Sequence, residues 1–170
     1  GDCAGGLVRQ GSTRGFHQRK NKNMTKLAEL SIESPQRPHR YARGWHCLGD
    51  AAAYRDGKLH TLNIFGTRLV AFANSEGAIS ILDAYCPHMG ADLSQGTIEN
   101  DTVVCPFHHW KYDTTGKCVE IPYCKRIPPK AKTRSWLTCE ENNLLFVWNN
   151  PEGRAPKEGV VIPHLEEMDS

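Results

Sequence analysis

The pattern of apolar and polar positions from residue 41 onward favours short β-strands over helices. Apolar and β-branched residues come in short runs, and clusters of Gly, Asn, Asp or Pro separate one run from the next. No stretch of a dozen residues keeps the 3.6-residue apolar period of an amphipathic helix. The runs predict strands over residues 45–48, 59–65, 69–72, 78–82, 102–105, 110–112, 118–121, 132–139 and 144–148.

Turn signals between these runs predict antiparallel hairpins. Gly66 and residues 74–77 separate neighbouring strands early in the chain, and residues 141–143 join the last two. The Pro-rich residues 127–131 are predicted to be extended, because proline fixes its own φ and restricts the residue before it. The expected fold class is therefore all-β, a stack of antiparallel sheets.

Composition divides the chain into one domain with flanking segments. Residues 41–150 hold all the predicted strands and form the expected domain, preceded by an N-terminal segment, 24–40, and followed by a polar tail, 151–170. Residues 1–23 carry five Lys and Arg against one acid and no apolar period. We expect them to be a basic leader or an extension acquired in expression, with Met24 as a candidate natural start.

Charge and cysteine usage exclude several classes of protein. The 147 residues after position 23 carry 16 basic and 18 acidic groups, so the body of the chain is not a nucleic-acid-binding surface. No apolar run approaches the roughly 18–20 residues that cross a membrane. We therefore expect a soluble, cytoplasmic protein. Seven cysteines, an odd number without a secretory signal, argue against a disulfide framework.

Two short motifs carry the chemistry of the chain. Cys86-Pro-His88 is followed, after a spacer of sixteen residues, by Cys105-Pro-Phe-His108. One Cys and one His from each of two loops is the ligand set of a Rieske-type 2Fe–2S cluster, with both thiolates on one iron and both imidazoles on the other. Neutral imidazoles raise the reduction potential to about −150 to +300 mV, against about −400 mV for plant-type clusters with four cysteines. We predict one-electron transfer through such a cluster.

Residues beside the motifs have expected supporting roles. Gly90 suits a tight turn whose amides point at sulfur, and Trp110 is expected to pack beside the cluster. His109 would need a C-x-x-x-H spacing to be a ligand, so we expect it near the cluster and not on it. A four-ligand structural zinc site is the alternative, although zinc sites usually pair C-x-x-C knuckles, or Cys pairs with His pairs.

Beyond the ligand motifs, the chain resembles a known family over about 120 residues. Residues 40 to about 163 are similar to the N-terminal Rieske domain of Rieske non-haem iron oxygenases. Within that family the resemblance is to the steroid branch, namely the oxygenase component of 3-ketosteroid 9α-hydroxylase and, more distantly, cholesterol 7-desaturases. The matching pieces are residues 42–49, 65–67, 81–86, 88–90, 92–97, 105–108, 116–118, 121–123, 132–134 and 145–148.

The resemblance implies partners for the electron. A ferredoxin or flavin reductase would supply it, and a mononuclear iron centre in an oxygenase catalytic domain would accept it. In the resembled oxygenases, a Rieske histidine contacts a carboxylate of a neighbouring subunit within a trimer, so His88 or His108 would make that contact in a homotrimer. The basic residues 125–134 could form part of a docking face, or simply a solvated loop.

Two departures from related patterns bear on these expectations. The catalytic domain of the family supplies a His-x4-His pair, which this sequence lacks; only His164 follows residue 109. We expect no complete active site, no catalytic residues and no steroid hydroxylation by the chain alone. An oxygenase fragment, a truncated homologue and a stand-alone Rieske ferredoxin all remain open. Quinol-oxidising Rieske proteins resemble a pattern with an extra Cys in each loop, and those places here hold Ala91 and Phe107.

Overall fold

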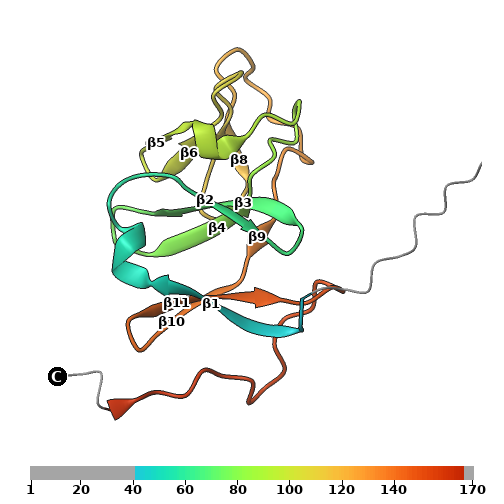
Figure 1. Ribbon diagram of the computed structural model, residues 1–170. Helices are drawn as coiled ribbons and strands as arrows, with labels where there is room; N and C mark the ends of the chain where they lie inside the picture. Colours follow the sequence, from blue (N-terminus) through green and yellow to red (C-terminus); the bar gives the residue numbers. More distant parts are fainter. Residues whose placement is uncertain (1–40, 167–170) are drawn as a thin grey trace, which may run out of the picture. The chain divides into compact units, whose positions relative to one another are not determined.

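Three antiparallel sheets make up the part of the chain that the computed structural model describes, residues 41–166 (Figure 1). The all-β expectation is confirmed, whereas the expectations for residues 1–23 and 24–40 lie outside the described residues. No helix among residues 41–166 is long and apolar enough to span a membrane.

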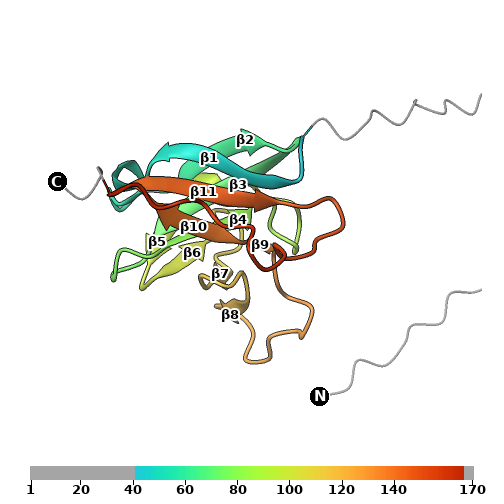
Figure 2. The same cartoon turned by 90° about the horizontal axis from the view of Figure 1, so that it is seen from below.

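The strands are distributed over a lower, a middle and an upper sheet as drawn in Figure 1. The lower sheet has the order β1 (Gly44–Asp50), β11 (Leu144–Asn149) and β10 (Thr138–Glu141), with β11 between its two partners in Figure 2. The middle sheet contains β2 (His60–Ile64), β3 (Thr67–Ala73), β4 (Ile79–Asp83) and β9 (Ser135–Trp136). The upper sheet contains β5 (Thr97–Glu99), β6 (Thr102–Val104), β7 (Lys111–Tyr112) and β8 (Cys118–Glu120). Two 3-10 turns, η1 (Ala51–Tyr54) and η2 (Leu93–Gln95), complete the described part.

Strand β3 explains why the molecule has two apolar cores. Its side chains alternate between the two faces of the sheet, and both faces are covered. Leu69 and Ala71 pack in the core shared with the lower sheet, whereas Val70 and Phe72 pack in the core shared with the upper sheet. All four are fully buried, which accounts for an apolar run without polar alternation. The upper core also contains the cysteines of the predicted site.

Two-residue turns join the strands of two hairpins, one in the lower and one in the upper sheet. Asn142 and Asn143 both have positive φ between β10 and β11, which is the backbone of a type I′ turn, so the predicted last hairpin is confirmed. Asn100 and Asp101 form the same kind of turn between β5 and β6. The sequence did not predict β5, a strand of only three residues.

Two local predictions were wrong. The strand predicted over residues 132–139 is divided at Leu137: β9 pairs with β4 in the middle sheet and β10 pairs with β11 in the lower sheet. The segment predicted to be extended contains a turn instead, closed by a 2.9 Å hydrogen bond from Ala131 N to Pro128 O. Proline fixes φ but leaves ψ free to enter a turn, and for this reason the extended prediction fails.

Candidate metal centre

The first Cys-x-His motif lies in a tight loop that follows β4. The backbone N–H of Cys86 donates to the carbonyl of Ala91 at 2.8 Å, and that of Gly90 donates to the carbonyl of Cys86 at 2.7 Å. Next to the loop, the Arg68 guanidinium donates to the Asp92 carboxylate at 2.6 Å. Burial alone would raise the pKa of Asp92, but hydrogen bonds from Ser94 and Arg68 hold it below its usual value. An ionised Asp92 therefore anchors the end of this loop.

The second loop connects β6 to β7 and repeats the hydrogen bonding of the first. Cys105 N donates to Trp110 O at 2.9 Å, and His109 N donates to Cys105 O at 3.1 Å. His109 thus takes the place that Gly90 has in the first loop, and both have left-handed backbones, with φ of 58° and 73°. The requirement at position 109 is conformational, and His is one of the residues that tolerate it.

The two loops bring the four predicted ligands together in a sorted arrangement. Cys86 and Cys105 are buried, with 2% and 1% of their surface exposed, and the proximity of Cys86 contributes to the raised pKa of Cys105. The rings of His88 and His108 lie at the outer end, with centroids 4.5 Å apart. Two thiols inside and two imidazoles outside fit the donor set of a Rieske cluster, in which each iron takes two protein ligands. Among the described residues, no three His, Cys, Asp or Glu side chains converge to hold a single ion.

Hydrogen-bond donors surround the buried sulfur atoms. Burial raises the pKa of Cys105. The backbone N–H groups of Phe107 and His108 donate toward its sulfur and lower the pKa, although by less than burial raises it. The Tyr112 hydroxyl lies 3.1 Å from the Cys86 Sγ. Burial, and next the contact with Cys86, raise the pKa of Tyr112 far above its usual value, so the hydroxyl keeps its proton. A thiolate at Cys86 would therefore accept a hydrogen bond from Tyr112.

An aromatic chain runs from the outer imidazoles to the surface. The Trp110 ring stacks on His88, with centroids 4.5 Å apart and planes 9° from parallel. Its indole N–H donates to the Tyr123 hydroxyl at 2.6 Å, and the Tyr123 side chain is exposed. Trp110 thus lies against His88, and His109, its neighbour in the sequence, is exposed.

Sequence reasoning missed Tyr112 and Tyr123. Trp110 and Tyr112 were assigned to a predicted strand, and their alternation shows that both face the same side. That signal could have placed Tyr112 in the same core as Trp110. No local signal connects Tyr123 with Trp110, because the contact depends on how the chain returns after β8.

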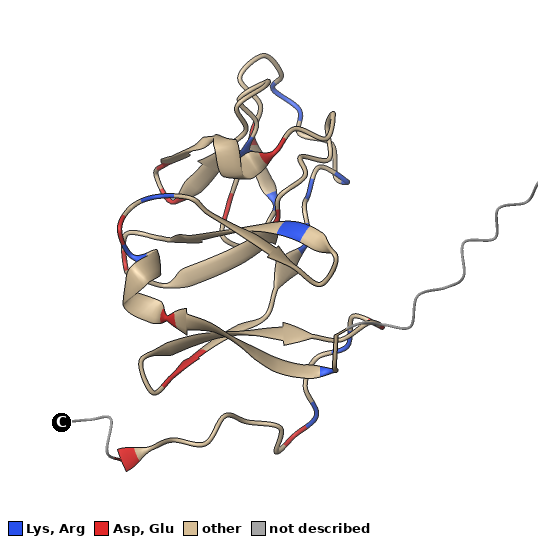
Figure 3. Cartoon of the chain, in the orientation of Figure 1, with Lys and Arg blue, Asp and Glu red and all other residues tan. Residues whose placement is uncertain are grey.

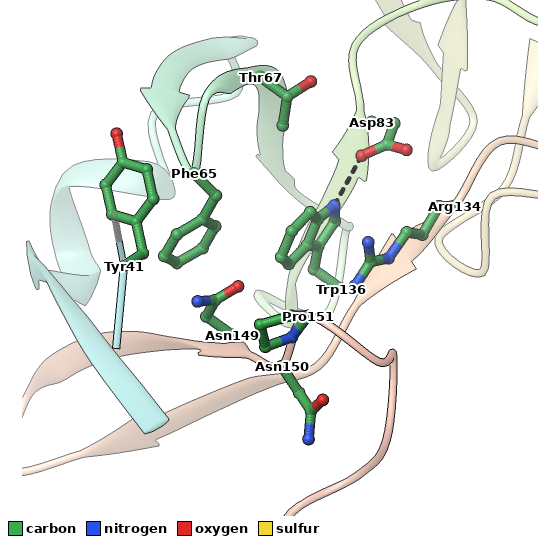
Figure 4. Close-up of a pocket in the computed structure, with 9 residues that line it drawn as sticks. All are labelled: Tyr41, Phe65, Thr67, Asp83, Arg134, Trp136, Asn149, Asn150 and Pro151. Atoms are coloured by element: carbon green, nitrogen blue, oxygen red, sulfur yellow. Dashed lines mark hydrogen bonds between the residues drawn. The ribbon is translucent and has the colours of Figure 1, made fainter. Parts of the chain in front are cut away.

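A separate cavity of about 310 Å³ lies between the turn that joins β2 to β3, the end of β4, strand β9 and the end of β11 (Figure 4). Phe65 stacks on Trp136 with ring centroids 5.2 Å apart, and the Arg134 guanidinium lies 3.8 Å from the centre of the same indole. The Trp136 indole N–H donates to the Asp83 carboxylate at 2.8 Å. None of the four predicted ligands lines this cavity.

The fold and the loops define an iron–sulfur protein of the Rieske class. The family model of the Rieske [2Fe-2S] domain matches residues 44–139, and the chain belongs to this family. The cofactor of the family is a Rieske-type 2Fe–2S cluster, and the donor set of the two loops is compatible with it. The role that follows for the domain is electron transfer.

Comparison with individual proteins shows which Rieske proteins the chain is similar to. The chain is 55% identical over 147 residues to a 3-ketosteroid-9-alpha-monooxygenase, oxygenase component, of Rhodococcus rhodochrous, covering 86% of this chain and 38% of the relative. It is 41% identical over 134 residues to cholesterol 7-desaturase nvd 1 of Ciona intestinalis, covering 78% and 28%. Among solved structures, apo dicamba monooxygenase superposes with a TM-score of 0.62 at 27% identity, covering 67% of this chain and 36% of that one. The chain thus spans about a third of the length of the relatives it matches.

Proposed function

We propose that Cys86, His88, Cys105 and His108 bind the Rieske cluster, with the cysteines on one iron and the histidines on the other. The observation that carries this assignment is the sorting of the four side chains into a buried pair of thiols and an outer pair of imidazoles. The cluster, when bound, supplies a one-electron redox couple. Tyr112 and the amides of the second loop would donate to sulfur, and Trp110 would exclude water from one side of His88.

We further propose that the chain is the electron-accepting domain of a steroid-type Rieske oxygenase. It would take electrons one at a time from a ferredoxin or a flavin reductase and deliver them to a mononuclear iron centre held outside this chain. The 55% identity to an oxygenase component that is named for a 3-ketosteroid reaction supports this proposal.

The outer face of the site offers a contact surface for the acceptor. Met89 and Phe107, one from each loop, are 64% and 57% exposed beside the histidines. Large apolar side chains on a surface commonly mark a contact with another protein. We propose that a catalytic domain covers this face and contacts His88 or His108. In a homotrimer, this catalytic domain would belong to the neighbouring subunit.

A redox titration followed by electron paramagnetic resonance tests the proposed function. We expect a Rieske signal that appears on reduction near the low end of the class, about −150 mV. A colourless protein with stoichiometric zinc and no signal at any potential would replace the electron-transfer function by a structural zinc site.

Replacement of Tyr112 by phenylalanine is expected to lower the reduction potential by about 40 mV. The hydroxyl stabilises the more negative, reduced state more than the oxidised state, and a hydrogen bond contributes about 1 kcal/mol. For a one-electron couple, a tenfold change in the equilibrium constant corresponds to about 59 mV. Tyr54→Phe is the matched control, because the Tyr54 hydroxyl donates to Leu48 O at the opposite end of the stack. An equal shift in both variants would contradict the role of Tyr112.

A further inference from the structure

Positive charge is concentrated in one segment of the described part, residues 117–134. Residues 41–166 contain 13 basic residues (Lys and Arg) and 14 acidic residues (Asp and Glu). Six of the basic residues and one of the acidic residues fall in this segment. The segment therefore carries a formal charge of +5. The rest of the described part has seven basic and thirteen acidic residues and carries a formal charge of −6. Lys and Arg recur along the loop that follows β8 (Figure 3). The six basic residues are Lys117, Lys125, Arg126, Lys130, Lys132 and Arg134.

These six cations are available to a partner. All of them are exposed, and none forms an ion pair within residues 41–166, although Arg134 already packs over the Trp136 indole. The one acid of the segment, Glu120, is paired with Lys111 at 3.1 Å and neutralises none of them. The segment therefore projects an uncompensated positive potential, which attracts an oppositely charged protein before contact.

The segment is fixed against the candidate metal centre. Ile121 and Ala131 are buried in the same core as Cys86 and Cys105. Tyr123, within the segment, accepts the hydrogen bond of the indole that stacks on His88. A protein bound on this segment would therefore lie next to one of the outer imidazoles.

The segment also contains apolar surface among its charges. A cavity of about 360 Å³ is lined by Lys117, Val119, Ile127, Pro128 and neighbouring residues. Val119 is 43% exposed at one wall of it. Apolar surface next to charged side chains is typical of a protein contact, in which the charges guide the approach of the partner and the apolar atoms are buried on binding.

We propose that residues 117–134 are the docking surface for an acidic electron-transfer protein that reduces this chain. The inference rests on the proposed function and adds to it the sign of the donor's charge and the side from which the donor approaches. The observations that carry it are the unpaired cations, their place beside His88 through Tyr123 and Trp110, and the apolar cavity among them.

The test measures the rate at which a reduced, acidic plant-type 2Fe–2S ferredoxin reduces the cluster-loaded chain in a stopped-flow instrument. The test variant combines Lys125→Glu, Arg126→Glu and Lys130→Glu. The control variant combines Lys58→Glu, Arg154→Glu and Lys157→Glu, which changes the net charge by the same −6 at exposed sites outside the segment. Both are compared with the unaltered chain at low and high ionic strength.

At low salt, where charges act over about 30 Å, we expect the test variant to react at least about tenfold more slowly and the control variant to change by less than about twofold. At about 1 M salt the three rates should converge, since the screening length falls to about 3 Å. Equal slowing by both variants would overturn the docking surface. Reduction by dithionite separates the two proposals: if the unaltered chain gives no Rieske signal with dithionite, the proposed function itself fails.

Discussion

Replacement of His108 by alanine is expected to abolish the Rieske signal, whereas replacement of the adjacent His109 by asparagine leaves it in place. His108 turns toward His88 at the outer end of the two loops, and its loss would leave one iron with a single protein ligand. His109 meets a backbone requirement instead, with a φ of 58° that asparagine also tolerates. Iron content and the electron paramagnetic resonance signal of the reduced protein measure the difference.

The pair of variants separates a ligand from its neighbour within one loop. Far-ultraviolet circular dichroism checks that both variants keep the β structure, so that a lost signal cannot be attributed to unfolding. If the His109 variant lost the signal and the His108 variant kept it, the ligand spacing would be C-x-x-x-H and our assignment of the outer pair would be wrong.

Replacement of Gly96 by alanine is expected to be strongly destabilising. An added Cβ would lie 2.0 Å from Val104 O and 3.1 Å from Leu93 O, both of them backbone atoms. Because β5 pairs with β6 directly beside it, the hairpin has to shift, at a cost of about 3 kcal/mol. The apparent melting temperature should fall by roughly 10 °C.

Gly153→Ala is the matched control for this substitution. Gly153 has a positive φ of 69° but open space around its Cβ position, so alanine there costs only about 1 kcal/mol of backbone strain. The Gly96 variant should also bind less iron, because Val104 directly precedes Cys105. A melting temperature equal to that of the control would show that the hairpin accommodates a methyl group without strain.

The sequence predicted the strands well where apolar runs and turn residues agree. β2, β3 and β4 are each bounded by Gly or Asn turns, and their predicted and observed limits differ by two residues or fewer. β5 was missed because three residues carry too little periodicity to show an alternation. The division of the strand at Leu137 was missed because tertiary contacts decide which sheet each half joins.

Local spacing alone selects the residues of the proposed ligand set. Cys86, His88, Cys105 and His108 were selected from local spacing, and the structure brings their side chains together. The contact of Tyr112 with Cys86 joins residues 26 positions apart, and no local pattern encodes it. The same holds for the basic segment, whose position beside His88 depends on the return of the chain after β8.

The two faces of β3 have a consequence for how the molecule opens. Val70 and Phe72 pack in the core that contains the thiols, whereas Leu69 and Ala71 pack in the opposite core. Neither core can open without exposing apolar side chains of β3, a strand that both cores share. We therefore expect the three layers to unfold as one cooperative unit. Damage to packing in the lower layer, which contains none of the proposed cluster ligands, would consequently also bleach the cluster.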